Sequence, residues 1–398
     1  MPESEANTDG LSAAPEPAAD DAPSAKIPEQ GDTDRAEVSS KPQRLFVWKW
    51  IFPFEIAAWV GLIAGVIFLR SRGLRIDWVT VEYTVPPLIP VLAKSFLTGI
   101  ALYTIYAWIR DGSPKTYFRQ IASWRWLLLS VRLWLAVIVF TYTYFWLKVS
   151  VPLVNHRLWD EAFWNLDILA HLGFSPSLFL TDLFSRSGLM PFLDLWYSWW
   201  LPSVSFSIAF FCAFPQQRFR RQFMLSCVLI WTLGAWLYVA LPALGPVYAY
   251  PEHWSEVTTQ MPRADGAQHL LWDNYQTVIG GRTGPLRQFN PTRGIAAMPS
   301  LHVGAHWLLM LWFRRRARPF FVVAVLGTFL TFIASIATGW HYAVDGYLGI
   351  FLAHGVYWLS LRWERPQGLE IGRKDRASGE PDTEQPRAGS IGHGDEAT

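Results

Sequence analysis

The fold of this chain is decided by two short stretches, Met298-Pro299-Ser300-Leu301-His302 and Gly339-Trp340-His341-Tyr342-Ala343-Val344-Asp345. Each stretch lies at the edge of a long apolar segment, and one apolar hairpin separates the two. Ionisable side chains at membrane depth are costly to bury, so they are functional candidates by default. We therefore expect two histidines and a carboxylate, namely His302, His341 and Asp345, to meet at one face of a membrane.

The composition is typical of an integral membrane protein. Of the 398 residues, 51% are hydrophobic and only 17% are charged, whereas a soluble domain carries about 25% charged residues. No basic patch interleaved with aromatic residues indicates nucleic acid as a partner. The two cysteines, Cys212 and Cys227, lie in or beside apolar segments, and their spacing fits no metal motif and predicts no disulfide.

The two ends of the chain are polar. Residues 1–43 are rich in Ala, Pro, Glu and Asp, so we expect a disordered acidic tail rather than a signal peptide. Residues 363–398 are expected to be disordered as well. Between these tails we expect accessory transmembrane helices at 44–124 and a membrane domain at 125–362 that carries both histidine motifs.

Eight apolar segments are long enough to cross a bilayer, which takes about 20 helical residues. The predicted fold class is therefore all-α, a polytopic bundle of about eight transmembrane helices. Lys94 and Asp194 lie deep in two segments and are expected to line the interior of the bundle. The expected spans are Phe46–Leu69, Pro87–Ile109, Trp126–Leu147, Leu189–Phe214, Phe223–Leu241, Ala296–Phe313, Pro319–Thr338 and Ala343–Leu361.

Basic residues in the short links predict the orientation, because Lys and Arg favour the cytoplasmic side. With eight spans, three basic links share one side, so both termini are expected in the cytoplasm and the histidines at the outer face of a plasma (inner) membrane. Three arginines in the first outer loop, Arg70, Arg72 and Arg75, argue against this orientation. The three links contain Arg110, Lys115, Arg119 and Arg125; Arg218, Arg220 and Arg221; and Arg314, Arg315, Arg316 and Arg318.

The spacing of His341 and Asp345 points to chemistry. Residues four apart share a helix face, so Asp345 can accept a hydrogen bond from His341 and raise the basicity of its other nitrogen. Such a histidine can attack phosphorus, and a protonated His302 can act as general acid. Ser300 offers a hydroxyl to a phosphate oxygen, and the amides at the start of its helix favour an anion. This chemistry needs neither a metal nor a cofactor, and no metal ligand set is evident.

Other histidines have simpler explanations. A single histidine near a membrane interface is often only a polar anchor. Catalysis is favoured because His302 and His341 occur together with Asp345. His306 is expected to be structural and His354 to pair helices. His156 and His171 are expected to face solvent or headgroups.

Together, Pro-Ser-Leu-His and His-Tyr-Ala-Val-Asp resemble the motifs of membrane proteins in the type 2 phosphatidic acid phosphatase superfamily. The branch containing fungal inositol phosphorylceramide synthase, the aureobasidin target, is most similar, since it has Pro-Ser-Leu-His where most lipid phosphatases have Pro-Ser-Gly-His. Trp159–Asp167, followed by Gly173 and Pro176, is similar to an amphipathic segment of that branch, and Leu244–Tyr248 to its Pro-containing turn. The resemblance covers about residues 125–360.

The resemblance implies that His341 is the nucleophile, Asp345 its orienting carboxylate and His302 the general acid. Two features of the superfamily are missing. A Lys followed at fixed spacing by Arg-Pro occurs at no plausible place, and the usual Arg six residues before the nucleophile is Ser335. The phosphate-binding cations are therefore sought in the outer loop, where Arg293 is the first choice, followed by the candidates Arg282 and Arg287.

That outer loop runs from Gly245 to Ile295. Loops this long are usually functional or disordered, and its many Gly, Pro, Asn and Arg residues suggest turns that cover the site as a lid.

The expected function is transfer of a phosphoryl headgroup between lipids through a phosphohistidine. The resemblance implies an inositol-phosphate headgroup and a ceramide-like acceptor, and phospholipids, polyprenyl lipids and sphingolipids are the substrate classes considered. A lipid phosphate phosphatase, with water as acceptor, is the alternative. A protein without enzymatic activity, such as a transporter or a scaffold, is the other class considered. Lys94, Asp194 and His306 are polar residues within the spans that are compatible with it. The sequence carries no signal of oligomeric state.

Overall fold

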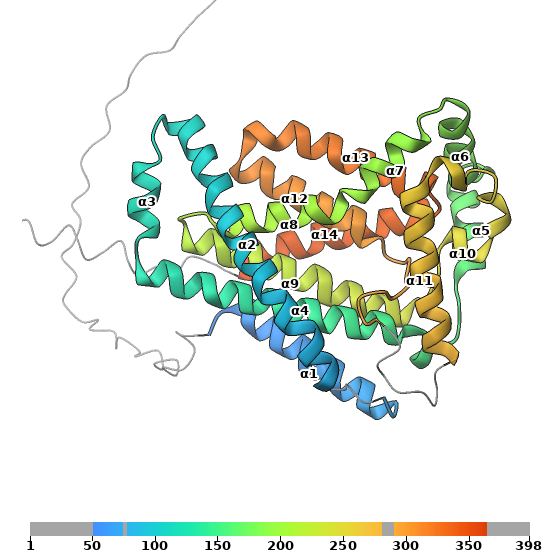
Figure 1. The fold of residues 1–398 in the computed structure, drawn as a ribbon, viewed down its shortest axis with the longest axis horizontal. Helices are drawn as coiled ribbons and strands as arrows, with labels where there is room; N and C mark the ends of the chain where they lie inside the picture. The colour runs from blue at the N-terminus through green and yellow to red at the C-terminus, as the bar shows by residue number, and fades with distance from the viewer. Residues whose placement is uncertain (1–50, 75–77, 281–289, 364–398) are drawn as a thin grey trace, which may run out of the picture. The chain divides into compact units, whose positions relative to one another are not determined.

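The computed structural model describes residues 51–74, 78–280 and 290–363, and within these ranges it is all-helical, without a strand (Figure 1). The expected tails therefore lie outside the described residues, apart from Trp363. The described helices include α1 (Pro53–Ser71), α2 (Trp78–Asp111), α4 (Trp124–Val154), α9 (Gln217–Ala240), α13 (Phe321–Ala337) and α14 (Ala343–Trp363). The others are α3 (Lys115–Ile121), α5 (Asp160–Ala170), α6 (Pro176–Arg186), α7 (Met190–Ser198), α8 (Trp200–Cys212), α10 (Pro246–Ala249), α11 (Pro262–Gly280) and α12 (Leu301–Arg316).

Among the described residues, five helical segments are long and apolar enough to cross a membrane, so the chain is an integral membrane protein. They correspond to the expected first, second, third, fifth and seventh spans. The expected sixth and eighth spans form α12, which has 16 residues, and α14, which has Asp345 in its first turn. The five segments are Pro53–Ser71, Pro90–Asp111, Trp124–Val154, Gln217–Ala240 and Arg318–Ala337.

One expectation about the fourth span and one about the second need correction. The segment is not one helix, because it is interrupted at Trp199 between α7 and α8. Pro202 explains the position of the break, since it has no N–H for the carbonyl of Ser198, the last residue of α7. Of the two charged residues expected in the interior, Asp194 is buried, whereas Lys94 is exposed on the surface of α2.

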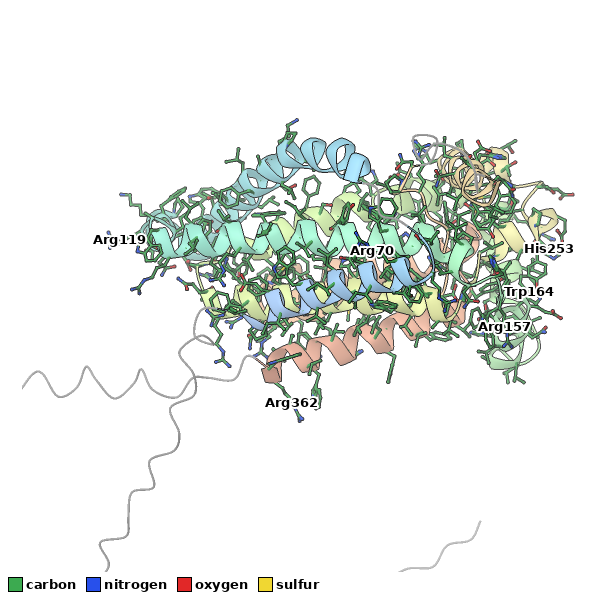
Figure 2. All side chains as sticks on the ribbon, turned by 90° about the horizontal axis from the view of Figure 1, so that it is seen from below. Arg70, Arg119, Arg157, Trp164, His253 and Arg362 are labelled. Carbon is green, nitrogen blue, oxygen red and sulfur yellow. The ribbon has the colours of Figure 1, made fainter. Side chains whose placement is uncertain are left out.

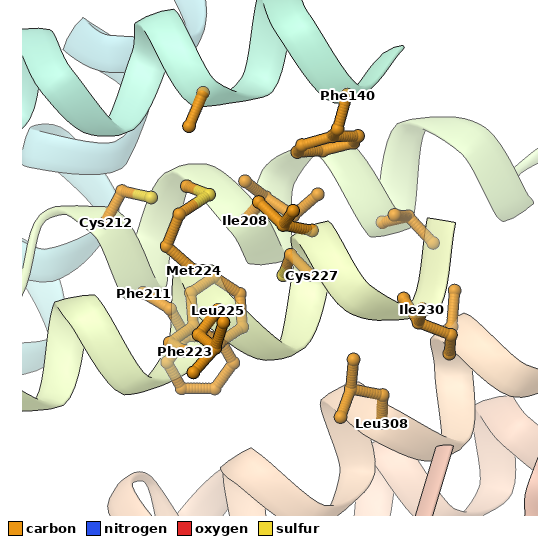
Figure 3. Packing of buried hydrophobic residues seen from close by; sticks show 14 of the residues in the cluster. Phe140, Ile208, Phe211, Cys212, Phe223, Met224, Leu225, Cys227, Ile230 and Leu308 are labelled. Carbon is orange, nitrogen blue, oxygen red and sulfur yellow. The ribbon is translucent and has the colours of Figure 1, made fainter. Parts of the chain in front are cut away.

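Helix α9 lies within the bundle and packs against α1, α4, α12 and α14. Figure 3 shows its side chains Phe223 and Met224 in a cluster with Phe140 of α4, Ile208 of α8 and Leu308 of α12. The two cysteines are buried in this region and free (Figure 3). This apolar packing holds α12 and α14, the helices next to the histidine motifs, against α9.

Helices α12 and α14 approach each other closely at two glycines. A Cβ at Gly304 would lie 2.9 Å from the carbonyl oxygen of Gly349, and a Cβ at Gly349 would clash with the carbonyl oxygen of Ser300. Only glycine permits backbones to come this near. The crossing therefore brings the first turn of α12 against the first two turns of α14.

The two ends of the bundle differ in character. The three basic links, which follow α2, α8 and α12, lie at one end, together with the described ends of the chain at residues 51 and 363 (Figure 1). Helices α5, α6, α10 and α11 lie at the opposite end. Figure 2 shows the same separation, with Arg119 at one end and Arg157, Trp164 and His253 at the other.

The long loop at residues 245–295, which was expected on the outer side, is more regular than predicted. Instead of turns alone, it contains the 19-residue helix α11, the short helix α10 and two 3₁₀ helices, Pro251–His253 and Thr258–Gln260. Pro262 occupies the first position of α11, where its missing N–H costs nothing. The loop therefore places a rigid element at the end of the bundle where the histidine motifs lie.

Candidate active site

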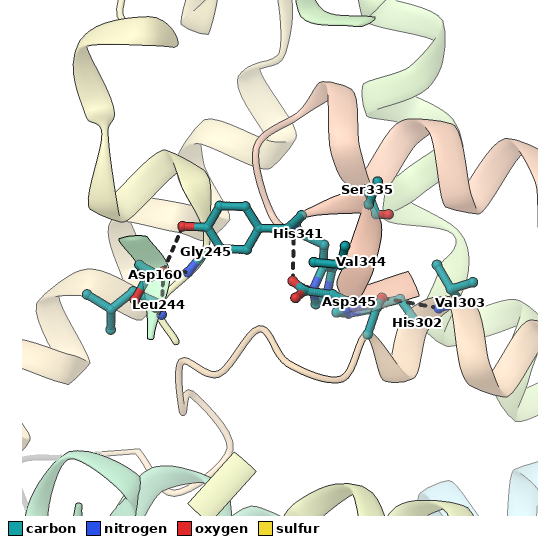
Figure 4. A network of polar contacts seen from close by, with 12 residues as sticks. Asp160, Leu244, Gly245, His302, Val303, Ser335, His341, Val344 and Asp345 are labelled. Atoms are coloured by element: carbon teal, nitrogen blue, oxygen red, sulfur yellow. Dashed lines mark hydrogen bonds and ion pairs between the residues drawn. The ribbon is translucent and has the colours of Figure 1, made fainter. Parts of the chain in front are cut away.

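The two histidine motifs meet, and their side chains form one polar chain. Nδ1 of His302 lies 2.8 Å from Nε2 of His341, and Nδ1 of His341 lies 3.3 Å from Oδ2 of Asp345 (Figure 4). His341 is 2% exposed and Asp345 is fully buried. The predicted meeting of these three residues is therefore present in the fold.

The polar chain determines which nitrogen of His341 carries a proton. If Nδ1–H of His341 donates to Asp345, its Nε2 has a free electron pair that accepts a hydrogen bond from Nδ1–H of His302. Burial, followed by the positive charge of Lys148, lowers the pKa of His341 to about 3. The imidazole is therefore neutral near pH 7, with a lone pair on the nitrogen that faces His302.

Ser300 places His302 by capping α12. Its side chain accepts a hydrogen bond of 3.4 Å from the backbone N–H of Val303, as a helix N-cap does. Its own N–H donates to the carbonyl of Asp345 over 2.9 Å. Ser300 is fully buried, so in this structure its hydroxyl serves the helix, and the predicted contact with phosphate stays a prediction.

Ser335 places His341 through its backbone. The carbonyl of Ser335 accepts hydrogen bonds from the N–H groups of Trp340 and His341, at 3.0 and 3.1 Å. The chain between them turns at Gly339, which has a φ of +79° that glycine adopts at no steric cost. At this position the superfamily has its arginine, and here the residue acts as a turn-forming acceptor.

Two carboxylates of α5 hold the site together, and the sequence analysis missed both. Asp167 accepts hydrogen bonds of 2.8 Å from the N–H groups of Ala343 and Val344, and so caps α14 from another helix. Asp160 accepts from the N–H groups at 244 and 245 and from the hydroxyl of Tyr342 at 2.9 Å (Figure 4). Burial raises the pKa of both carboxyl groups, and the hydrogen bonds they accept oppose this rise.

Removing the Asp167 carboxylate is expected to destabilise the start of α14. Asp167→Ala leaves two buried backbone N–H groups without an acceptor, which costs about 2 kcal/mol or more of unfolding free energy. Thermal unfolding of the purified protein in detergent measures this loss as a lower melting temperature. Glu161→Ala is the matched control, because Glu161 is exposed on the same helix. Equal melting temperatures for the two variants would contradict the capping role.

Helix α11 is the helical part of the loop that is expected to cover the site, and we call it the lid. Buried Asp194 of α7 accepts from the N–H groups of Arg263 and Ala264 at 3.1 and 2.7 Å, and so caps the lid. One turn later the side chain of Gln268 donates to the carbonyl of Thr338 over 2.8 Å. The lid is thereby fastened to the turn that carries His341, and Asp194 has a structural role.

The remaining histidines of the motif helices have partners of their own. His306 lies 2.9 Å from both the carbonyl of His302 and the hydroxyl of Ser203, which agrees with a structural role. His354 accepts a hydrogen bond of 3.0 Å from the indole of Trp307 and so pairs α14 with α12. Within the described ranges, no group of three His, Cys, Asp or Glu side chains could hold a metal ion.

Of the three arginines predicted to bind phosphate, only Arg293 lies among the described residues, because Arg282 and Arg287 fall outside them. Arg293 is half-buried, and its carbonyl accepts a hydrogen bond of 3.0 Å from Asn274 of the lid. Its guanidinium has no ion-pair partner in the part of the chain that the structure describes. Lys148 of α4, which the sequence analysis did not select, is a basic residue whose charge acts on His341.

A comparison with family models identifies the superfamily. The model of the PAP2 superfamily matches residues 161–359, which include Asp167 and the rest of α5 after Asp160, the lid, and the two histidine motifs. No curated protein and no solved structure matches the chain significantly. Because the family model covers half of the chain, this protein belongs to the PAP2 superfamily.

Proposed function

We propose that this protein transfers a phosphoryl headgroup from one lipid to an alcohol acceptor through a phosphohistidine on His341. The observation that carries the proposal is the chain from Asp345 through His341 to His302. An activated histidine nucleophile needs a carboxylate that orients it and a nearby acid that protonates the leaving group. Here the buried carboxylate contacts one nitrogen of the His341 ring, and the imidazole of His302 contacts the other. Membership of the PAP2 superfamily supports lipid phosphatase or phosphotransferase activity.

In the first step, Nε2 of His341 forms a bond to phosphorus, and the bond from phosphorus to the departing alcohol oxygen breaks. His302, in its protonated form, gives that oxygen a proton. The negative charge of the bound phosphate favours this protonated form. The phosphoryl group must enter between the two imidazoles, so substrate binding replaces their 2.8 Å contact.

In the second step, the acceptor hydroxyl gives its proton to His302 and its oxygen attacks phosphorus. The bond from phosphorus to Nε2 breaks, and both histidines return to their starting states. Asp345 keeps the His341 ring in the same orientation and tautomer through both steps. With water as acceptor, the same two steps make the protein a lipid phosphate phosphatase.

The family precedent suggests an inositol-phosphate donor and a ceramide-like acceptor, with polyprenyl lipids as another class. We place the site at the outer face of the plasma (inner) membrane and both termini in the cytoplasm. The basic links support this orientation, because they lie together at the end of the bundle opposite α5 and α11.

Mass spectrometry of lipid products tests the proposal. Purified protein in detergent is incubated with a panel of phospholipids, with and without diacylglycerol, ceramide or other alcohol acceptors. We expect a new lipid that carries the donor headgroup and appears only when an acceptor is present. Free phosphate or a free phosphoalcohol at the same rate with and without acceptor would contradict transfer and establish a hydrolase.

A further inference from the structure

Two hydrogen-bond donors beside the histidine pair have no partner. The hydroxyl of Tyr197 and the indole nitrogen of Trp340 are buried, and neither has a hydrogen-bond partner among the described residues. A buried donor without a partner destabilises a fold by about 1–3 kcal/mol. Such a pair next to a reactive site therefore indicates groups that a ligand completes.

Both aromatic rings lie against the site. The ring of Tyr197 is 5.2 Å from the ring of His302 and stacks on that of Trp340 at 6.1 Å. Trp340 directly precedes His341 in the chain, and its backbone is held by the same Ser335 carbonyl. The two donors thus come from two separate elements, α7 and the turn before α14.

Lys148 brings a positive charge to the same region. Its ammonium lies 5.7 and 5.4 Å from the ring centres of Tyr144 and Tyr238, and no carboxylate of the described residues lies within ion-pair distance. Gly294 packs against the backbone of Lys148, where a Cβ would lie 2.9 Å from its carbonyl carbon, and this contact holds the loop before α12 against α4.

The three groups share one chemical property. A tyrosine hydroxyl, an indole N–H and an ammonium can all donate hydrogen bonds, and the last two cannot accept any. They therefore suit a ligand that has only acceptors and a negative charge. A phosphoryl group has both features, and it is the group that His341 would attack.

We propose that Tyr197, Trp340 and Lys148 bind the oxygens of the phosphoryl group that is transferred, a role that rests on the proposed function. Tyr197 and Trp340 supply neutral donors, and Lys148 supplies the charge that the superfamily draws from its missing Lys and Arg positions. As negative charge shifts between oxygens during attack, fixed donors in a buried site stabilise it without reorganisation.

Binding of inorganic phosphate tests this assignment without any turnover. Isothermal titration calorimetry is performed on the full chain in detergent, with Tyr197→Phe, Trp340→Phe and Lys148→Met compared with wild type. Each of the first two substitutions deletes one donor and keeps the ring. We expect each to raise the Kd for phosphate about 10-fold, and Lys148→Met to raise it about 100-fold, as loss of hydrogen bonds to a charged group does.

Trp134→Phe is the matched control. The indole nitrogen of Trp134 is also buried without a partner among the described residues, but it lies on α4 about 21 Å from Lys148 along the helix axis. We expect this variant to bind phosphate as wild type does. The KM for the lipid donor should rise in Tyr197→Phe and Trp340→Phe and stay unchanged in Trp134→Phe.

The outcomes separate this inference from the proposed function. If wild type binds phosphate and turns over lipid, and Tyr197→Phe and Trp340→Phe match it in both assays, the assignment is wrong while the function stands. Equal weakening by Trp134→Phe would also overturn it, because the effect would then come from the loss of any buried indole N–H. If wild type neither binds phosphate nor turns over any lipid phosphate, the proposed function fails and the assignment fails with it.

Discussion

Replacing His341 with alanine is expected to abolish headgroup release and transfer. The substitution removes the atom that forms the bond to phosphorus, and loss of a catalytic nucleophile lowers kcat by about 10⁴-fold or more. Product formation from labelled phospholipid measures the loss, with elution of a monodisperse protein on size exclusion as the test of folding.

His269→Ala is the control for this result. His269 lies on the lid helix, its side chain is 75% exposed, and its partner is Asp265 at 3.4 Å. This variant should keep the wild-type rate. A His341→Ala protein that transfers headgroups as fast as His269→Ala would remove His341 from the mechanism.

The second large effect is expected for Asp345→Asn. The substitution keeps the size of the side chain but removes the charge that holds Nδ1–H of His341, so the ring can adopt the wrong tautomer. In a serine protease triad the same change lowers kcat about 10⁴-fold, and we expect a fall of about 10²- to 10⁴-fold here. The KM should change little, because Asp345 is fully buried behind His341.

Steady-state kinetics of Asp345→Asn over a range of lipid concentrations separates the two parameters. An increase in KM with kcat unchanged would mean that Asp345 supports binding rather than the orientation of His341. An unchanged kcat and KM would show that the 3.3 Å contact between the two side chains has no part in catalysis.

Much of the fold could be predicted from the sequence, because a membrane span leaves a strong apolar signal. Five expected spans correspond to long apolar helices, and the basic links lie together. The break at Trp199 was not predicted, although Pro202 indicates it. The segment was assigned by its hydropathy, and hydropathy does not register the loss of one backbone N–H. The lid helix α11 was missed because its N-terminal cap, Asp194, comes from a helix about 70 residues earlier.

The centre of the site could be predicted from spacing, but its support could not. The interval between His341 and Asp345 predicts their contact, although His341 itself lies in a turn before α14 begins. Asp167 accepts a hydrogen bond from a backbone N–H 176 residues away, and Asp160 accepts one from a tyrosine hydroxyl 182 residues away. An amphipathic helix with two acidic residues seven apart gives no indication that both are buried acceptors.

Local sequence spacing also gave no indication of the groups that we propose to bind phosphate. The superfamily pattern favours arginines, so arginines of the loop nearest to the motifs were expected to bind phosphate. The groups that we propose are a lysine of α4, a tyrosine of α7 and a tryptophan of the motif itself. Their proximity depends on how α4 and α7 pack around the site, which local spacing does not encode.

The most direct test of the central claim is detection of phosphate on His341 during turnover. The protein is mixed with its phospholipid donor in the absence of acceptor, quenched in alkali, which preserves phosphohistidine, and digested for mass spectrometry. The account predicts a headgroup phosphate on the peptide that contains His341, its disappearance when acceptor is added, and its absence in His341→Ala. Turnover of the donor with no modified His341 peptide, and at an equal rate in His341→Ala, would contradict the account.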